Sequence, residues 1–260
     1  MAERRVAPPE ALMPGDIITL LTDFGTADSY VAEVKAALLG QPHGATLVDI
    51  THQVSPGDVR AGQYILSRVW RRFPEGTVHL VVVDPGVGTT RRALAAEGDG
   101  HYFVAPDNGL LTSLPGTARF VQLPIPPGAA PTFHARDVFA PAAALLAIGT
   151  ALTHVGKSIT DPYRSPLPSP RMDGLTVVGE VLYVDRFGSL VSNIPAEQVA
   201  PGVRIKVVGT DVGSLRRTYG DVEPGQLLAY VGSDGSVEVA VRGGSAARLL
   251  GVGVGAEVRA

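Results

Sequence analysis

The sequence predicts an α/β fold in which an N-terminal domain with a doubly wound, mostly parallel sheet precedes a small C-terminal all-β barrel domain. From residue 17 to about 155, short apolar runs alternate with stretches of helical periodicity, the order that builds a parallel sheet covered by helices. A segment with four prolines follows, and after it come short β-rich runs separated by glycine-containing turns. We therefore place the α/β domain at 15–157, a Pro-rich linker at 158–174 and the barrel domain at 175–260.

Each element of the first domain follows from its local pattern. Strands are expected where an apolar run ends in a polar residue, and the unbroken run of TVHLVVVD suits a sheet that is covered on both faces. Helices are expected where apolar residues recur every three or four positions, as Val34 and Leu38 do. The expected strands are 17–23, 45–51, 77–84, 92–98, 101–107 and 118–123, and the expected helices are 28–41, 59–73 and 139–152.

The second domain lacks the alternation of strands with helices. Its expected strands are 176–185, 189–194, 204–209, 227–232 and 237–241. The sequence SDGS at 233–236 is a hairpin signal, because Asp-Gly favours the positive φ angles of a two-residue turn. A run of short strands joined by tight turns predicts a small barrel.

Composition excludes several classes of function. The chain of 260 residues is 45% hydrophobic and 18% charged with a net charge of −3, so neither nucleic acid nor an anionic membrane is an expected partner. It has no cysteine, which rules out disulfides, a thiolate nucleophile and Cys-ligated metals. No apolar run has the length of a membrane span, and the N-terminus lacks the apolar core of a signal peptide. We expect a cytoplasmic protein whose residues 1–14 are poorly ordered.

The candidate site begins where the first strand ends, in TDFGTADSY. Ligands of open α/β sheets bind at the carboxyl ends of the strands, and a carboxylate there can bind ribose hydroxyls. Asp23 is therefore either a ligand contact or a structural turn residue. Asp28 and Ser29 stand at the helix start, where each is either a helix cap, with Glu33 in the first turn, or a substrate contact.

A second strand end, VVVDPGVGTTRRAL, carries the most informative motif. Pro85 fixes an extended exit from the strand, and the two glycines after it let backbone N–H groups face a ligand. Asp84 with an arginine can hold and polarise a water molecule; the alternative is a turn stabilised by the same ion pair. Arg91 and Arg92 point to opposite faces of an extended chain, so only one of them should reach Asp84.

Two further segments of the first domain carry candidate residues. PDNGLL is strong turn chemistry, and Asn108 is its best candidate for a ligand contact. In FHARDVFAP, Asp137 can cap the following helix and pair with Arg136. His134 is either structural or a group that orients a nucleophile.

The second domain repeats the pattern of carboxylate, aromatic residue and glycine in VDRFGSLVSNI. Phe187 can stack on a base, while Asp185 or Asn193 holds hydroxyls or an amino acid. Asx-turn chemistry explains Asp185 equally well. The segment RGGSAARLLG, with Ser245 and Ala246, either reads an adenine edge through main-chain atoms or simply closes the domain.

Several common motifs are absent from the sequence. There is no P-loop, no Gly-x-Gly-x-x-Gly fingerprint and no Gly-x-Ser-x-Gly elbow. The six histidines show no close metal-binding spacing. We expect no metal site and no cofactor.

Taken together, TDFGTADSYVAEVK, DITHQV, VDPGVGTTRRAL, PDNGLL, FHARDVFAP and DRFGSLVSN closely resemble the S-adenosyl-L-methionine hydroxide adenosyltransferase family, hydrolases of S-adenosylmethionine related to the fluorinase and chlorinase. The motifs come in family order and cover roughly residues 17–251. The resemblance implies that water cleaves S-adenosylmethionine at the ribose 5′-carbon into adenosine and L-methionine. It also implies a homotrimer with substrate between the N-domain of one subunit and the C-domain of its neighbour.

The resemblance also implies roles for individual residues. The family's catalytic Asp–Arg–His set matches Asp84, Arg91 and His134. Its ribose-binding acid matches Asp23, and its methionine-contacting acid matches Asp185. Its aromatic walls around the nucleoside match Phe133 and Phe187.

The chain departs from the family pattern at a few positions. Ala135 stands where the fluorinase has a halide-contacting serine, and Ser189 stands where family members often carry asparagine for a methionine contact. Gly243 and Gly244 replace a more polar adenine loop. Two alternatives to hydrolysis are a chlorinase on the same scaffold and a sensor that binds S-adenosylmethionine or adenosine with negligible turnover.

Overall fold

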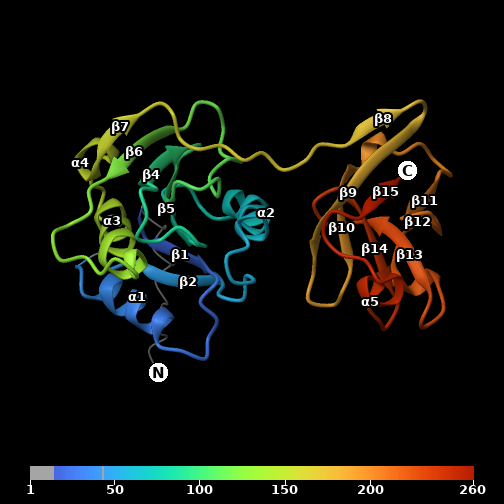
Figure 1. Cartoon of the computed structure of the whole chain (residues 1–260), viewed down its shortest axis with the longest axis horizontal. Helices are drawn as coiled ribbons and strands as arrows, with labels where there is room; N and C mark the ends of the chain where they lie inside the picture. The colour runs from blue at the N-terminus through green and yellow to red at the C-terminus, as the bar shows by residue number, and fades with distance from the viewer. Residues whose placement is uncertain (1–14, 43) are drawn as a thin grey trace, which may run out of the picture. The chain divides into compact units, whose positions relative to one another are not determined.

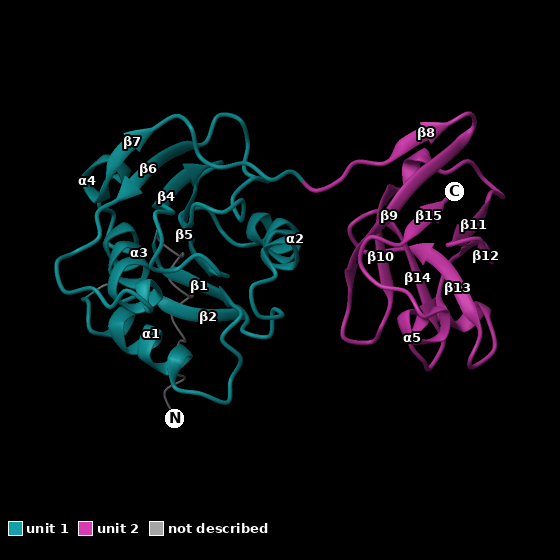
Figure 2. Cartoon of the chain, in the orientation of Figure 1, with its two compact units in different colours: residues 1–166 teal, residues 167–260 magenta. Residues whose placement is uncertain are grey.

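The computed structural model describes residues 15–42 and 44–260 of the chain (Figure 1). The chain divides into two compact units, residues 1–166 and residues 167–260 (Figure 2). The expectation for residues 1–14 lies outside the described residues. No helix in the described part of the chain has the length and apolar character that crossing a membrane requires.

Unit 1 contains alternating strands and helices, as predicted. In chain order they are β1 (Ile17–Thr22), α1 (Tyr30–Leu39), β2 (Thr46–Thr51), α2 (Val59–Val69), β3 (Val78–Val82), β4 (Ala93–Gly98), β5 (His101–Pro106), β6 (Arg119–Leu123), α3 (Ala140–Ala147), α4 (Leu152–Val155) and β7 (Lys157–Ile159). A 3-10 turn, η1 (Trp70–Arg72), extends α2, and a π-helical turn, η2 (Ala135–Phe139), leads into α3.

The described strands of unit 1 form one mixed sheet in the order β2-β1-β3-β5-β4-β6-β7. The strands β2, β1, β3 and β5 are parallel, whereas β4, β6 and β7 pair antiparallel. The α/β class is confirmed, but the parallel arrangement covers only the first half of the sheet. The reason is a two-residue turn, Asp99 and Gly100 with φ of 47° and 76°, which joins β4 to β5 and is too short for a parallel crossover.

Helices cover both faces of this sheet. Val34 and Leu38 of α1 share one core with α3 and with alternate residues of β1 and β3. On the other face, Gly62 of α2 lies against Val83, and Trp70 packs edge-on against Phe103 at 5.3 Å between ring centroids. Coverage on both faces is the doubly wound arrangement that the sequence predicts.

Two buried histidines lie inside the sheet of unit 1. His79 of β3 has its Nδ1 atom 2.8 Å from Thr19 Oγ1 on β1 and its Nε2 atom 3.2 Å from Nδ1 of His101 on β5. Both imidazoles are buried. Burial, and then the neighbouring His101, lowers the pKa of His79 to about 3. The sheet therefore holds His79 in its neutral form.

Because the fold holds His79 in its neutral form, we expect unit 1 to lose stability in acid. Between a pH of about 6.5 and about 3, the unfolded chain binds a proton on His79 that the folded chain rejects, so the free energy of unfolding falls as the pH falls. His79→Gln should flatten this slope by up to about 1.4 kcal/mol per pH unit. Urea unfolding at several pH values, followed by the fluorescence of Trp70, the single tryptophan, measures the slope. The exposed His154→Gln is the control, and an unchanged slope in His79→Gln would contradict the prediction.

Unit 2 consists mainly of short strands. They are β8 (Arg171–Asp173), β9 (Thr176–Val184), β10 (Leu190–Pro195), β11 (Arg204–Val207), β12 (Thr210–Arg216), β13 (Leu227–Val231), β14 (Ser236–Val241) and β15 (Glu257–Arg259), with one helix, α5 (Ala246–Leu250), and the 3-10 turns η3 (Ala196–Gln198) and η4 (Tyr219–Asp221). The sheet order is β10-β14-β13-β12-β11-β15-β9-β8, and pairing of β10 with β9 closes a barrel of seven strands. The predicted barrel is confirmed.

The barrel includes strands that local patterns do not indicate. β12 and β15 are absent from the expected strands, yet β15 pairs with both β11 and β9 and completes the closure. The segment expected to be a linker also contributes strands at its two ends, because β7 pairs with β6 and β8 pairs with β9. Short strands of this kind are defined by their partners and not by their own sequence.

Candidate active site

Three polar side chains of unit 1, two from the connection between β3 and β4 and one from the segment before α3, meet just beyond the carboxyl end of β3. Arg91 Nε donates a hydrogen bond to Asp84 Oδ1 at 2.9 Å, and Arg91 Nη2 donates to Asp84 Oδ2, so the guanidinium binds both carboxylate oxygens. Arg91 Nη2 also lies 3.1 Å from His134 Nδ1. The side chains of Asp84 and Arg91 are only 5% and 9% exposed, so water screens their charges little.

The arginine fixes the protonation state of His134. A guanidinium can only donate hydrogen bonds, so His134 Nδ1 is the acceptor and the ring carries its proton on Nε2. Burial, and then the charge of Arg91, lowers the pKa of His134, although Asp84 and Asp137 act in the opposite direction. The neutral imidazole therefore offers its Nε2–H as a hydrogen-bond donor.

The backbone next to Asp84 is held by the loop that follows β5. Asn108 Nδ2 donates to the carbonyl of Val83 at 2.8 Å, so Asn108, a predicted ligand contact, supports the exit from β3. Arg92 turns away from Asp84 and donates to Asp107 Oδ2 at 2.7 Å. The prediction that only one of the two arginines reaches Asp84 is confirmed.

The residues predicted around the start of α1 differ in their surroundings. Asp23 directly follows β1, and its Oδ2 accepts a hydrogen bond from the backbone N–H of Gly57 at 2.7 Å. Ser29 occupies the N-cap position without a side-chain cap, because its Oγ donates to Glu33 Oε1 at 2.8 Å. Asp28 is exposed in the preceding turn. The structure thus places Asp23 at the strand end and leaves Asp28 and Ser29 on the surface.

An aromatic cluster adjoins Asp23 in the chain. The rings of Phe24, Tyr30 and Phe133 contact one another with centroids 5.5 to 6.1 Å apart. The guanidinium of Arg136 lies over Phe133, 4.9 Å from its centroid. Phe133 is a predicted wall of the site, whereas the sequence analysis misses Phe24 and Tyr30. Their position on either side of the glycine turn in TDFGTADSY is the signal that could have indicated them.

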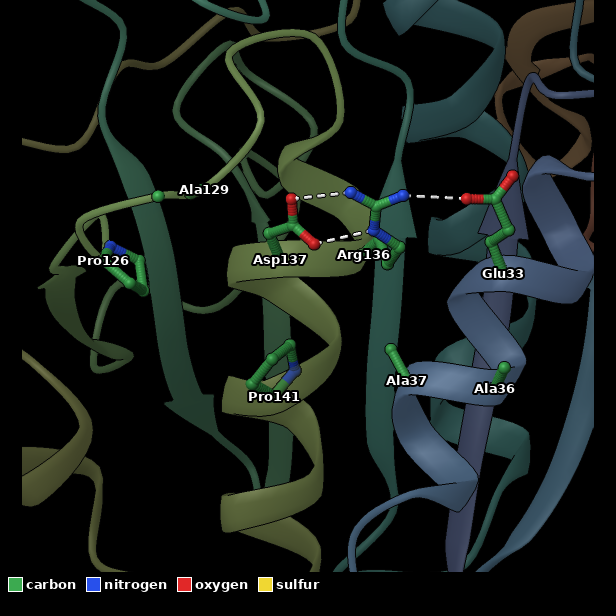
Figure 3. Close-up of a pocket in the computed structure, with 9 residues that line it drawn as sticks. Glu33, Ala36, Ala37, Pro126, Ala129, Arg136, Asp137 and Pro141 are labelled. Carbon is green, nitrogen blue, oxygen red and sulfur yellow. Dashed lines mark hydrogen bonds and ion pairs between the residues drawn. The ribbon is translucent and has the colours of Figure 1, made fainter.

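Arg136 and Asp137 line a separate hollow between α1 and α3 (Figure 3). Arg136 donates to both carboxylate oxygens of Asp137, and its Nη1 donates to Glu33 Oε2 at 2.8 Å. Asp137 Oδ2 also accepts from the backbone N–H of Ala130 at 2.8 Å, so it supports the preceding loop and does not cap α3. Figure 3 shows these charged groups turned toward one another above a floor of alanine and proline. No predicted site residue lines this hollow, although Glu33 of the network also accepts the hydrogen bond from Ser29.

In unit 2, predicted residues gather around a hollow of about 560 Å³. Phe187 and Ser189 line it from the turn after β9, and Gly243 and Gly244 line it from the loop after β14. The ring of Phe187 is 78% exposed, while Ser189 is buried. An exposed aromatic ring beside a glycine loop suits a flat ligand such as a nucleobase.

The turn and the loop that line this hollow are packed together. A Cβ atom at Gly188, which has φ of 83°, would lie 2.0 Å from Ser245 Oγ. The backbone N–H of Ala247 donates to the carbonyl of Gly188 at 3.0 Å. Ser245 caps α5 by accepting from the backbone N–H of Arg248 at 3.2 Å, and Ala246 is fully buried. The two predicted segments therefore form one continuous wall.

Asp185 and Asn193 hold backbone in this region. Asp185 Oδ1 accepts from two backbone N–H groups of its own turn, at 2.9 and 2.7 Å, which is the Asx-turn alternative. Within the described residues its Oδ2 makes no hydrogen bond, so that oxygen is available to a ligand. Asn193 uses both ends of its amide, donating to the Pro168 carbonyl at 2.9 Å and accepting from the Glu180 N–H at 2.8 Å.

Tyr219, which the sequence analysis misses, also lines the hollow of unit 2. Its hydroxyl donates to Tyr230 Oη at 2.7 Å, and Tyr230 donates to the buried carboxylate of Glu238. Burial, and then the hydrogen bond with Glu238, raises the pKa of Tyr230, so this phenol keeps its proton. No motif surrounds Tyr219 in the sequence; it reaches the site only because the pairing of β13 with β14 sets Tyr230 opposite Glu238.

The two groups of residues differ in their chemistry. The Asp84 carboxylate, bound through both oxygens by an arginine and poorly screened by water, suits the binding and activation of a water molecule. The hollow of unit 2 offers stacking and shape instead. Across residues 15–42 and 44–260, no group of three or more His, Cys, Asp or Glu side chains could hold a metal ion.

A polar cluster at the carboxyl ends of parallel strands, in a unit joined to a β-barrel with its own aromatic hollow, defines a two-domain α/β protein that binds small molecules. The SAM hydroxide adenosyltransferase N-terminal domain matches residues 18–156, and the SAM hydroxide adenosyltransferase C-terminal domain matches residues 179–259. The chain therefore belongs to the SAM hydroxide adenosyltransferase family, and the resemblance inferred from the six motifs is confirmed.

Several relatives match the chain over most of its length. Proteins named (R)-S-adenosyl-L-methionine hydrolase from Thermus thermophilus and Salinispora tropica are 43% and 42% identical, cover 93% and 95% of this chain, and are each covered over 98% of their own length. A fluorinase from Nocardia brasiliensis is 30% identical, with 94% and 96% of the two chains covered. A solved structure of a conserved protein from Thermotoga maritima is similar with a TM-score of 0.85 at 35% identity, covering 93% of this chain and 98% of its own.

The buried ion pair predicts a large cost when one partner is removed. Arg91→Met leaves the Asp84 carboxylate buried and unpaired, so the free energy of unfolding of unit 1 should fall by about 3–5 kcal/mol. The double variant Asp84→Leu/Arg91→Met should recover much of that loss, because both charges are gone. Urea unfolding measures both. Arg119→Met, which breaks an exposed pair with Glu97, should cost less than about 1 kcal/mol, and equal costs for the two single variants would contradict the prediction.

Proposed function

We propose that this protein hydrolyses S-adenosyl-L-methionine to adenosine and L-methionine by in-line attack of water on the ribose 5′-carbon. The observation that carries the proposal is the buried cluster in which Arg91 binds both oxygens of Asp84 and contacts His134. The names of the relatives at 41–43% identity support the reaction and make the (R) form of the sulfonium the substrate to test first.

The chemistry asks little of the protein beyond positioning. The water oxygen bonds to C5′ while the carbon–sulfur bond breaks and its electron pair goes to sulfur, which leaves as a neutral thioether. No general acid is needed, because the sulfonium is already an activated leaving group. The water gives up one proton through Asp84 to solvent, so the products are adenosine, methionine and a proton. Placing that water about 3 Å from C5′, in line with the carbon–sulfur bond, supplies the rate.

In this proposal each residue of the cluster has a separate role. Asp84 accepts a hydrogen bond or the proton from the attacking water. Arg91 holds that carboxylate in a fixed orientation, and the Nε2–H of His134 orients the water or relays its proton. Asp23 holds the ribose hydroxyls beside Phe133. No metal or cofactor takes part.

Unit 2 supplies the remaining contacts in the proposal. Phe187 stacks on the adenine, main-chain groups at Ser245 and Ala246 read its edge, and the open oxygen of Asp185 binds the amino group of the methionine part. Ser189 stands where a further methionine contact would be. We also propose that the chain works as a cytoplasmic homotrimer, in which a neighbouring copy completes each site.

Ala135 argues against fluorination, because it is buried and carries no hydroxyl donor for fluoride, while the charged cluster suited to water is present. The chlorinase alternative is tested by the products formed with and without chloride. A sensor that binds S-adenosylmethionine without turning it over would show the same binding residues, so only a measurement of products separates it from a hydrolase.

The test is to incubate the purified protein with each sulfonium form of S-adenosylmethionine, with and without chloride, and to separate the products by chromatography. We expect adenosine and methionine in equal amounts, independent of chloride. A chlorinated nucleoside formed only with chloride would establish the chlorinase, and intact substrate despite tight binding would establish the sensor.

Asp84→Asn should separate chemistry from binding. The amide keeps the shape of the carboxylate but cannot accept the proton, so kcat should fall by about 10²–10⁴-fold. The Kd for adenosine should change little, because the ribose and adenine contacts lie elsewhere. Asp99→Asn, in an exposed turn, is the matched control with unchanged kcat. Full turnover by Asp84→Asn would remove Asp84 from the catalytic role.

A further inference from the structure

A series of polar contacts runs from the surface of unit 1 to the residue before Asp23. Lys35 Nζ lies 2.7 Å from Asp49 Oδ2, and Asp49 Oδ1 lies 3.1 Å from His52 Nε2. His52 Nδ1 lies 2.8 Å from Thr22 Oγ1. Thr22 and His52 are 1% and 5% exposed, so water does not replace the contact between them, whereas Lys35 and Asp49 are partly exposed. The mechanism proposed above uses none of these four side chains.

The direction of these contacts follows from what each atom can do. Thr22 Oγ1 accepts from the backbone N–H of Phe24 at 3.3 Å, and in the tautomer with the ring proton on Nε2 its own proton is donated to His52 Nδ1. In that tautomer His52 Nε2 faces the carboxylate of Asp49 at 3.1 Å. Burial of Asp49 acts to raise its pKa, but the hydrogen bonds from Lys35 and His52 outweigh it and the net pKa is lowered. Asp49 therefore stays ionised and anchors these contacts.

His52 and its loop also bind the turn that carries Asp23 at two further points. The backbone N–H of Gly25 donates to the His52 carbonyl at 2.7 Å. The backbone N–H of Gly57, from the same loop, donates to Asp23 Oδ2 at 2.7 Å. In the chain, Asp23 thus lies between Thr22, which contacts the His52 ring, and Gly25, which donates a hydrogen bond to the His52 carbonyl. Its Oδ1 makes no hydrogen bond within the described residues and is the oxygen open to a ligand.

We propose that His52 is a positioning residue that sets the carboxylate of Asp23 for the hydroxyls of a ribose. The proposal rests on the proposed function, in which Asp23 holds the ribose. A hydrogen bond between a fixed carboxylate and a hydroxyl depends steeply on distance and angle, so loosening the turn weakens that contact first. Adenine stacking and the chemistry at Asp84 do not depend on these contacts of His52.

The measurement is the ratio of dissociation constants for 2′-deoxyadenosine and adenosine, repeated with 3′-deoxyadenosine, by calorimetry. Loss of a hydrogen bond to a charged group typically weakens binding about tenfold or more, so the native protein should show that ratio for at least one of the deoxy compounds. His52→Ala should lower the ratio to about two, because the carboxylate no longer reaches the hydroxyl well. A general loss of stability would weaken all three nucleosides alike and leave the ratio unchanged.

Two conservative variants distinguish the contact of His52 with Thr22 from its contact with Asp49. The Oδ1 atom of Asn stands close to the position of His Nδ1, so His52→Asn keeps an acceptor for Thr22 and should retain most of the ratio. In His52→Gln the longer side chain reaches toward Asp49 but places no acceptor beside Thr22 Oγ1. This variant should therefore behave like His52→Ala. If His52→Ala does not fold, Thr22→Val removes the hydrogen bond to His52 together with the one from the Phe24 N–H, at constant shape, and should lower the ratio in its place.

His101→Gln is the matched control, because His101 is similarly buried and hydrogen-bonded but lies away from the Asp23 turn. It should lose stability and keep the ratio. An unchanged ratio in both His52→Ala and Thr22→Val, or an equal fall in His101→Gln, would overturn the proposal. Failure of the proposed function is a different result, since it would appear in the native protein as no hydrolysis of S-adenosylmethionine.

Discussion

The pairing of β1 with β3 is the constraint on which the rest of the site depends. The two strands run parallel with Thr22 opposite Val82, so both chains leave the sheet at the same level and Asp23 and Asp84 follow within two residues. A slip by one residue would turn every side chain of β1 to the other face of the sheet. The hydrogen bond from Asn108 to the Val83 carbonyl and the one from Gly57 to Asp23 then hold the two neighbouring strand ends in place.

Burying the Asp84–Arg91 pair costs free energy, because both charges lose their hydration. This cost indicates that the pair serves the function of the site and not the stability of the fold. Replacing a buried ion pair by apolar residues is often neutral or stabilising, so stability alone gives little reason to keep one. What the pair provides is a fixed negative charge in a poorly hydrated place, with its orientation set before a substrate arrives. The neutral imidazole beside it adds a donor without adding charge, because Arg91 and burial both hold His134 deprotonated at Nδ1.

The sequence predicts those parts of the molecule in which neighbouring residues decide the outcome. The apolar runs before Asp23 and Asp84 indicate both strand ends, and alternation along an extended chain correctly separates Arg91 from Arg92. Prediction from the sequence fails where contacts between segments distant in the chain determine the structure. The antiparallel half of the sheet, the strands β12 and β15, and Tyr219 at the hollow of unit 2 all depend on pairing across the fold. Asn108 is an instructive case, because a turn motif suggests a ligand contact while the carbonyl of Val83 needs its amide.

The contact between Gly188 and Ser245 limits how the hollow of unit 2 can be altered. The two segments that line it approach so closely that no side chain fits at position 188, and each is hydrogen-bonded to the other. A change in the loop that carries Ser245 therefore shifts the turn that carries Phe187. An effort to fit this hollow to a different ligand would have to vary both segments together, because a change confined to one of them would no longer pack against the other.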